Sequence, residues 1–260
     1  MGDSVLRAAL ATGPANDDAP WDRFDSDEYF WHNYKHLRHD DARIIDIVAD
    51  FFEHCFDRAQ PRALANAIDV GSGTNLYPAL TMLPFAARVT LFERSHTNRQ
   101  WLIDALVKPQ SSWRDEFWPA ISDGRPAYQR IKDPMDVLAG LAWVTKGNVF
   151  ALRSGQSGAY DLGTMFFVAE SITTRDDEFE RATLNFIDSL KPGSPFAAAF
   201  MCRSEGYYVG STFFPAYSID DTDVKSCLES VARISQIERV DSDDLRDGYS
   251  GMIVATGWKR

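Results

Sequence analysis

Short apolar runs alternate with amphipathic stretches along most of this chain. The apolar runs predict buried strands at 67–70, 88–92, 149–152, 162–168 and 196–202. Apolar positions at helical spacing predict helices at 40–58, from near 76, and at 98–106, 178–190 and 221–230. Because strands that alternate with helices build parallel sheets covered on both faces, this pattern predicts an α/β fold.

The chain ends on two apolar runs, at 234–240 and 252–256, with no helical pattern between them. Such a pair predicts an antiparallel hairpin at the edge of the sheet. With the preceding strands, we expect a Rossmann-like seven-stranded sheet that is mostly parallel and carries helices on both faces.

Three segments lie outside the regular alternation. Residues 1–20 precede any periodic pattern and are expected to form a mobile tail, and 21–60 an N-terminal helical lid. The remaining 61–260 form the ligand-binding domain, with an insertion at 109–146 that holds an amphipathic helix near 134–144. The insertion is too aromatic for a flexible linker, so it should pack on the core or over a site.

Charge and composition narrow the possible partners. The 38 acidic against 27 basic residues give a formal net charge of -11, which disfavours a nucleic-acid substrate. No apolar run approaches the roughly 18 residues that span a bilayer, and no signal-peptide core is present, so a cytoplasmic protein is expected. The three cysteines have no disulfide or metal spacing. His32, His36 and His39 lack a partner set, so no metal site is predicted.

A short strand that leads into a glycine turn is the strongest local signal. In Ile-Asp-Val-Gly-Ser-Gly at 68–73, the glycines let the backbone turn tightly and approach a ligand. A dinucleotide fingerprint needs a third glycine, where this chain has Leu76. Glu93 ends the next strand about twenty residues downstream, where a carboxylate can accept ribose hydroxyls. Each feature alone also suits a structural role, but together they predict a nucleoside ligand without a pyrophosphate, such as S-adenosylmethionine.

Several segments resemble the nicotinamide, phenylethanolamine and indolethylamine N-methyltransferase family of class I S-adenosylmethionine-dependent methyltransferases. The stretch 68–77, IDVGSGTNLY, is similar to the cofactor motif of that family, and so is the spacing from Glu93 to Asn98. The tyrosine segment YFWHNY at 29–34, LKPG at 190–193 and YYVG at 207–210 resemble further parts of it. The resemblance covers about 24–257, apart from the insertion.

This resemblance implies roles for single residues. The methionine half of the cofactor would be lined by Tyr29, Tyr34, Gly71, Ser72, Gly73, Thr74 and Tyr77, and Tyr34 would also act in catalysis beside the sulfonium. Glu93 and Asn98 would hold the ribose, and Asn148 and Val149 would meet the adenine. Relatives carry Asp-Val there, but the Asn148 carbonyl can still accept from the adenine amine. Tyr207 and Tyr208 would bind the substrate.

The acceptor end departs from the family. Relatives that bind amines or nicotinamide carry an aspartate where this chain has Met201. Nicotinamide and catecholamines are therefore not predicted as substrates of this chain. Glu170, after the fourth strand, is the predicted catalytic carboxylate, and helix capping is its alternative role. Trp113 and Trp118 are predicted to bind substrate by walling the acceptor pocket with aromatic surface. The alternative is that both tryptophans pack in a satellite hydrophobic cluster that covers one helix face.

The combined expectation is an S-adenosylmethionine-dependent methyltransferase of bacterial secondary metabolism that methylates N or O of a small aromatic or heteroaromatic acceptor by in-line displacement. A catalytically silent cofactor-binding or regulatory protein is the first alternative. A nicotinamide-dependent oxidoreductase is disfavoured by Leu76 and by the closing hairpin, which is typical of class I methyltransferase sheets. Oligomeric state is left open.

Overall fold

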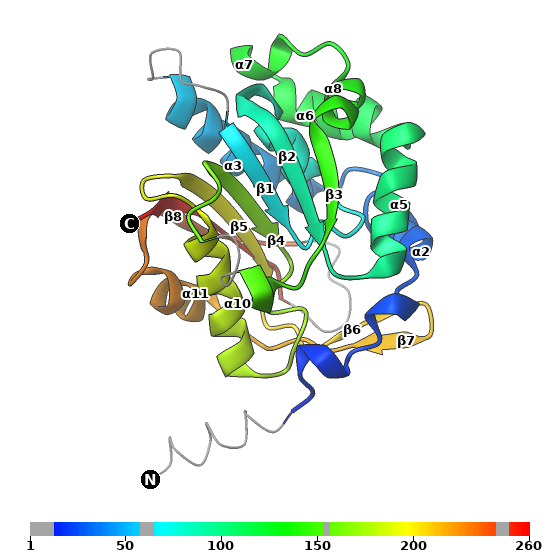
Figure 1. The fold of residues 1–260 in the computed structure, drawn as a ribbon, viewed down its shortest axis with the longest axis vertical. Coiled ribbons are helices and arrows are strands. Elements are labelled where there is room, and N and C mark those ends of the chain that lie inside the picture. The colour runs from blue at the N-terminus through cyan, green and yellow to red at the C-terminus, as the bar shows by residue number, and fades with distance from the viewer. Residues whose placement is uncertain (1–12, 58–64, 153–156, 243–249) are drawn as a thin grey trace.

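A seven-stranded sheet organises the protein (Figure 1). The computed structural model describes residues 13–57, 65–152, 157–242 and 250–260. The strand order is β3-β2-β1-β4-β5-β9-β8. The strands are β1 Ala65–Val70, β2 Ala86–Glu93, β3 Ala142–Lys146, β4 Leu162–Phe166, β5 Pro195–Met201, β8 Ala232–Val240 and β9 Met252–Lys259. β9 pairs antiparallel with both β5 and β8, whereas the pairs among β1 to β5 are parallel. The predicted fold class and closing hairpin are confirmed.

Strand side chains alternate between two cores, one on each face of the sheet. In β5, Ala197 and Ala199 belong to one core, while Phe196 and Phe200 belong to the other. The first core packs against α3 His39–Asp57, α4 Tyr77–Met82 and α5 His96–Val107. The second packs against α10 Asp176–Ser189 and α11 Asp221–Leu228. Burial on both faces explains why these strands read as continuous apolar runs.

The third strand differs from its prediction. Residues 149–152 were expected as a strand, but Val149–Ala151 form the 3-10 helix η5, and β3 lies upstream within the expected insertion. The Asn148 side chain accepts a hydrogen bond from Phe150 N at 3.0 Å and so starts the helical turn. β3 is a partly exposed edge strand that directly follows α8 Pro134–Leu141, which concealed it within a helical pattern.

The insertion is therefore shorter than predicted, and it packs on the first core. After α5 come the π-helical turn η4 Trp113–Phe117, α6 Trp118–Ser122, α7 Pro126–Gln129 and α8. Arg125, in the loop before α7, bridges to α3 through Asp46 and Asp50 at 2.9 and 2.6 Å. These ion pairs fix the insertion to the body.

The N-terminal segment also departs from expectation. Residues 1–12 lie outside the described part of the chain, but 13–20, expected within a mobile tail, pack against the body. Thr174 N, for example, donates to Pro14 O at 3.1 Å. The short helices η1 Asn16–Asp18 and η2 Trp21–Arg23 lead into α2 Ser26–Asn33, at the start of the expected lid (Figure 1).

A hairpin outside the main sheet was not predicted. Its strands are β6 Tyr207–Val209 and β7 Thr212–Phe214. Phe214 contacts the rings of Trp21 and Phe24 at centroid distances of 5.1 Å, so the hairpin packs on the N-terminal segment. Within the described ranges, no helix combines the length and apolar character needed to cross a membrane.

Candidate functional site

A cavity opens where β1, β2 and β4 end, beneath the N-terminal segment. It encloses about 760 Å³ together with its open mouth. Among the residues that line it are Tyr29, Tyr34, Gly71, Ser72, Gly73, Thr74, Glu93, Asn98, Asn148, Val149 and Tyr207, each predicted from the sequence as a site residue. Open α/β sheets bind ligands at the carboxyl ends of their strands, and this cavity has that position.

The glycine turn after β1 forms the floor of the cavity. Gly71 and Gly73 have φ values of +69° and +54°, a region that side chains disfavour. A Cβ on Gly71 would lie 2.4 Å from Val168 Cγ2, and Gly71 N donates to Phe92 O at 2.7 Å. The turn therefore requires glycine for both its conformation and its close approach to neighbouring strands.

Glu93 joins this turn to the end of β2. Its carboxylate accepts from Gly73 N at 2.9 Å and from Ser95 N at 2.7 Å. Burial raises the pKa of Glu93, while these two hydrogen bonds act in the opposite direction. Each carboxylate oxygen has more than one acceptor site, so Glu93 can still receive hydroxyl donors from a ligand. Nearby, Asn98 Oδ1 accepts from Ser26 Oγ at 2.7 Å, which ties α5 to α2.

A second acid, Asp69, lies just before the glycine turn in β1. It is 1% exposed, and its Oδ1 accepts from Thr164 Oγ1 at 2.7 Å. Burial raises the pKa of Asp69 to about 7. Sequence analysis did not single it out, although an aspartate inside an apolar strand is a visible signal.

Several buried polar atoms around the turn make no hydrogen bond within the described ranges. They are Asp69 Oδ2, Thr74 Oγ1 and Asn75 Nδ2. Buried polar groups are normally paired, because an unpaired one costs about 1–3 kcal/mol. Thr74 and Asn75 both line the cavity, so they are suited to a ligand with polar groups.

A second cavity shares Tyr29, Phe167 and Tyr207 with the first. It encloses about 1440 Å³ with its open mouth, and its wall combines Phe and Tyr rings with polar side chains and glycines. Tyr208 and Phe213, on the hairpin, contact each other at 5.2 Å and line it. Tyr207 therefore lines both cavities, and Tyr208 lines the second.

Phe167, between the two cavities, has an unusual backbone. Its φ is +58°, although it is neither glycine nor a small polar residue. The conformation is held by a hydrogen bond of 2.7 Å from Phe167 N to Ala199 O. Strained residues of this kind cluster at functional sites. Nothing in the sequence pattern marked Phe167.

Glu170 lies behind the second cavity and lines neither one. It is fully buried, and its Oε1 accepts from Met201 N and Ser171 Oγ, both at 2.9 Å. Burial raises the pKa of Glu170 to about 7. Glu170 does not cap a helix, because α10 begins only at Asp176. It does not contact either cavity. Glu170 instead supports the backbone of Met201, which does line the second cavity.

Three other predicted site residues lie in the core and outside these cavities. Tyr77 is fully buried, stacks on Phe117 at 5.8 Å and meets Tyr34 edge-on at 6.2 Å. Trp113 is fully buried behind Tyr34, at 5.9 Å, and Trp118 packs on Tyr128 at 6.1 Å. The aromatic wall expected from Trp113 and Trp118 is not formed by them, because the insertion faces the first core.

Other lining residues come from the N-terminal segment. Asn16 lies in 13–20, which was expected within a mobile tail, whereas Trp21 and Phe24 lie in the expected lid, and all three line the first cavity. The backbone of Asn16 is held by Glu178, far along the chain, so local patterns carried no signal for its position.

Comparison with known proteins defines the fold further. No family model matches the chain, and no curated protein matches it either. Among solved structures, a SAM-dependent methyltransferase from Methanosarcina mazei is 13% identical with a TM-score of 0.55, covering 80% of this chain and 96% of its own. The 1,6-didemethyltoxoflavin-N1-methyltransferase of Burkholderia thailandensis, solved with S-adenosylhomocysteine, is 12% identical with a TM-score of 0.52, covering 99% and 88%.

A third similar structure is described as a cyclase and not as a methyltransferase. The 4+2 cyclase SpnF is 16% identical with a TM-score of 0.51, covering 99% of this chain and 92% of its own. At these identities the likeness concerns the fold alone, and fold does not determine reaction. The chain therefore has the Rossmann-like fold found in S-adenosylmethionine-dependent methyltransferases.

Proposed function

We propose that the protein binds S-adenosylmethionine and transfers its methyl group to a small acceptor. The observation that carries this proposal is the meeting of two cavities across Tyr29, Phe167 and Tyr207. The first cavity is lined by the glycine turn and by Glu93, whose carboxylate can accept ribose hydroxyls. The second is lined in part by Phe and Tyr rings. Methyl transfer requires such an arrangement, because donor and acceptor must approach from opposite sides.

The unpaired polar atoms suit this cofactor. Thr74 Oγ1 and Asn75 Nδ2 are donors for its carboxylate, because both residues line the first cavity. Asp69 is not assigned to the cofactor, because it does not line that cavity. Glu93 and Asn98 are assigned to the ribose, and Val149 to the adenine end. Gly71, Ser72 and Gly73 let the methionine half lie against the backbone.

When bound, the cofactor supplies an activated methyl group on a sulfonium. The protein contributes alignment, which can lower a barrier by roughly 7–11 kcal/mol when the reacting atoms are held about 3 Å apart. Tyr29 and Tyr34 present aromatic rings to the first cavity, where they favour a cation and exclude water. Glu170 is not assigned as a base, because it lines neither cavity.

The second cavity favours a neutral or cationic aromatic acceptor. Phe167, Tyr208 and Phe213 offer flat apolar surface for stacking. Of the described residues that line it, Glu28 is acidic, His32 is titratable and none is Lys or Arg, so a permanent positive charge is lacking for an anionic acceptor. N and O acceptors are both compatible with this wall.

Calorimetry with S-adenosylhomocysteine and with NAD tests the cofactor assignment. We expect micromolar-range binding of the first and none of the second; the reverse result, or binding of neither, would overturn the proposal. Formation of S-adenosylhomocysteine from S-adenosylmethionine is then measured over a panel of phenols, aromatic amines and N-heteroaromatics. Binding without turnover of any panel member would favour the catalytically silent alternative.

A further inference from the structure

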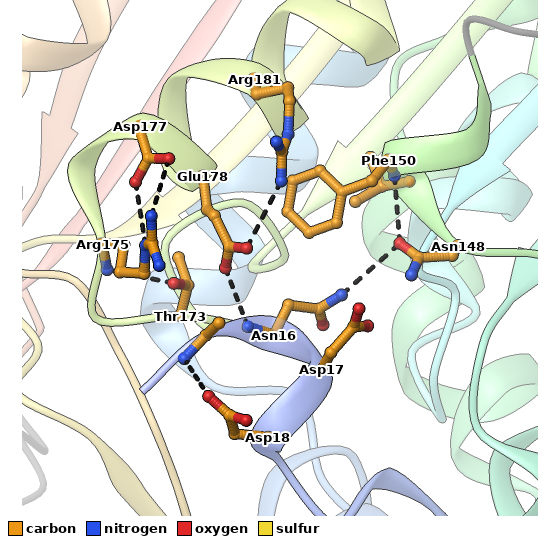
Figure 2. Close-up of polar contacts among 12 residues, drawn as sticks. Asn16, Asp17, Asp18, Asn148, Phe150, Thr173, Arg175, Asp177, Glu178 and Arg181 are labelled. Carbon is orange, nitrogen blue, oxygen red and sulfur yellow. Dashed lines mark hydrogen bonds and ion pairs between the residues drawn. The ribbon is translucent and has the colours of Figure 1, made fainter. Parts of the chain in front are cut away.

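The segment 13–24, here called the strap, crosses the end of the first cavity beside Asn148. Its residue Asn16 is 2% exposed and lines that cavity. Figure 2 shows Asn16 between Glu178, at the start of α10, and Asn148, after β3. The strap therefore brings an amide side chain to the same place as the predicted adenine contact.

Three hydrogen bonds fix the main chain of Asn16. Its N donates to Glu178 Oε2 at 2.8 Å, and its O accepts from Trp21 Nε1 at 2.8 Å and Arg94 Nη1 at 2.9 Å. Arg94 also pairs with Asp17 at 3.0 Å. Because the main-chain atoms are fully used, the Asn16 side chain is held in place without contributing to these bonds.

The two amides at this end are not equivalent. Asn148 Oδ1 accepts from Phe150 N at 3.0 Å and from Asn16 Nδ2 at 3.5 Å, so its carbonyl already serves the protein (Figure 2). Asn16 Oδ1, by contrast, accepts no hydrogen bond from any described residue. Because Asn16 lines the first cavity, a ligand there that supplies a donor can pair this oxygen.

We propose that Asn16 recognises the base of the nucleoside cofactor, with its Oδ1 accepting from the exocyclic amine of adenine. This inference rests on the proposed function. Asn148 is a positioning residue, since its oxygen holds the Asn16 NH₂ group and turns the Asn16 oxygen away from it. An asparagine amide is well matched to an adenine edge, which pairs an amine donor with a ring-nitrogen acceptor. A base with a carbonyl in place of the amine would meet the Asn16 oxygen with a second acceptor.

Base exchange in the ligand tests this assignment. We would titrate wild type, Asn16→Ala and Arg23→Ala with S-adenosylhomocysteine and with S-inosylhomocysteine, which carries a carbonyl in place of the amine. Wild type should prefer the adenine ligand by roughly tenfold or more, the difference made by one buried hydrogen bond. Asn16→Ala should lose that preference, mainly through weaker binding of S-adenosylhomocysteine. Arg23→Ala, a change in the same strap at an exposed residue outside the lining of the first cavity, should keep it.

The ratio of the two affinities is the decisive quantity, because incomplete folding lowers both by the same factor. A wild-type ratio near one, or an Asn16→Ala ratio equal to that of wild type, would overturn the assignment and leave Asn16 as a support of the strap. If wild type binds neither ligand, the proposed function itself fails and this inference with it. If wild type binds both equally well, only the role of Asn16 fails.

Discussion

Three buried carboxyl groups surround the two cavities, and their surroundings differ. Glu93 accepts two backbone hydrogen bonds, whereas Asp69 Oδ2 and Glu170 Oε2 accept none from the described residues. Burial raises the pKa of all three, and it brings Asp69 and Glu170 to about 7. Single residues at this site are therefore divided between ligand contact and support, and mutation can separate the two roles.

Replacing Glu93 with alanine should abolish most affinity for S-adenosylhomocysteine. Two charge-assisted hydrogen bonds to a buried ribose are worth on the order of 2–4 kcal/mol, roughly 30- to 1000-fold in Kd. Calorimetric titration measures this loss, with Glu229→Ala, an exposed carboxylate at the C-terminal end of α11, as matched control. Because Glu93 also accepts from Gly73 and Ser95, thermal unfolding is recorded for each variant. Affinity within twofold of wild type would remove Glu93 from the site.

Asp69 should make the protein less stable as pH rises from about 4 to 7. Its folded pKa of about 7 lies above the ordinary 3.8, so the folded state holds a proton that the unfolded state has lost. Stability from this group is present at acidic pH and disappears as pH rises through 7. Between pH 5 and pH 8 the loss is on the order of 2–3 kcal/mol, at about 1.4 kcal/mol per pKa unit.

Asp69→Asn imitates the neutral carboxyl and should lose less stability over that interval. Urea unfolding of both proteins at pH 5 and pH 8 gives the comparison, in which all other titrating groups cancel. An identical pH dependence for the two proteins would show that Asp69 has an ordinary pKa.

At the scale of secondary-structure elements, the insertion serves the core more than the cavities. η4 and α6 place Trp113 and Trp118 against Tyr34 and Tyr128, and α8 covers β2. β3 follows at the sheet edge with Trp143, which is 60% exposed under the Arg88 guanidinium. Trp118 is thus buried in the first core, whereas Trp143 is exposed at the edge of the sheet.

Trp118→Ala should destabilise the fold by roughly 3–5 kcal/mol, because it empties a buried site. Trp143→Ala, the matched change on the exposed edge, should cost about 1 kcal/mol or less, for the loss of one exposed cation–π contact. Thermal unfolding and turnover are measured for both variants. Lost turnover in Trp118→Ala at an unchanged melting temperature would contradict the packing role and return Trp118 to the acceptor pocket.

At the scale of the whole molecule, the first cavity has a cover made of the strap, α2 and the β6–β7 hairpin, each of which contributes lining residues. Figure 1 shows these elements at one end of the sheet. Hydrogen bonds anchor this cover to the body, among them Ser26 Oγ to Asn98 Oδ1 at 2.7 Å and Trp101 Nε1 to Asp27 Oδ1 at 3.0 Å. A cover that closes on a ligand gains contacts when the ligand binds.

Hydrogen exchange should therefore slow in residues 16–34 when S-adenosylhomocysteine is added, because Asn16, Tyr29 and Tyr34 line the cavity from above. α11, on the opposite face of the sheet, provides the internal reference and should keep its exchange rates. Equal protection of 16–34 with and without ligand would refute a closing cover.

Sequence alone determined what depends on short-range order. The alternation of strands and helices, the closing hairpin and the glycine turn all follow from patterns within a few neighbouring residues. Glu93, at the end of β2, was marked by its spacing from the glycine turn, whereas Asn98, in the first turn of α5, was marked only by the resemblance to a known family. These features were predictable because backbone geometry and burial on both faces constrain each segment locally.

Only the tertiary structure decided what long-range contacts arrange. Asn16 reaches the cavity because Glu178, 162 residues away in sequence, accepts its backbone N–H. Trp113 and Trp118 turn toward the core because α3 and α4 cover that side, and β3 forms because β2 offers it an edge. Phe167 keeps its positive φ through a bond to β5. Each outcome depends on a contact with a distant part of the chain. The local pattern of apolar and polar residues does not predict such a contact.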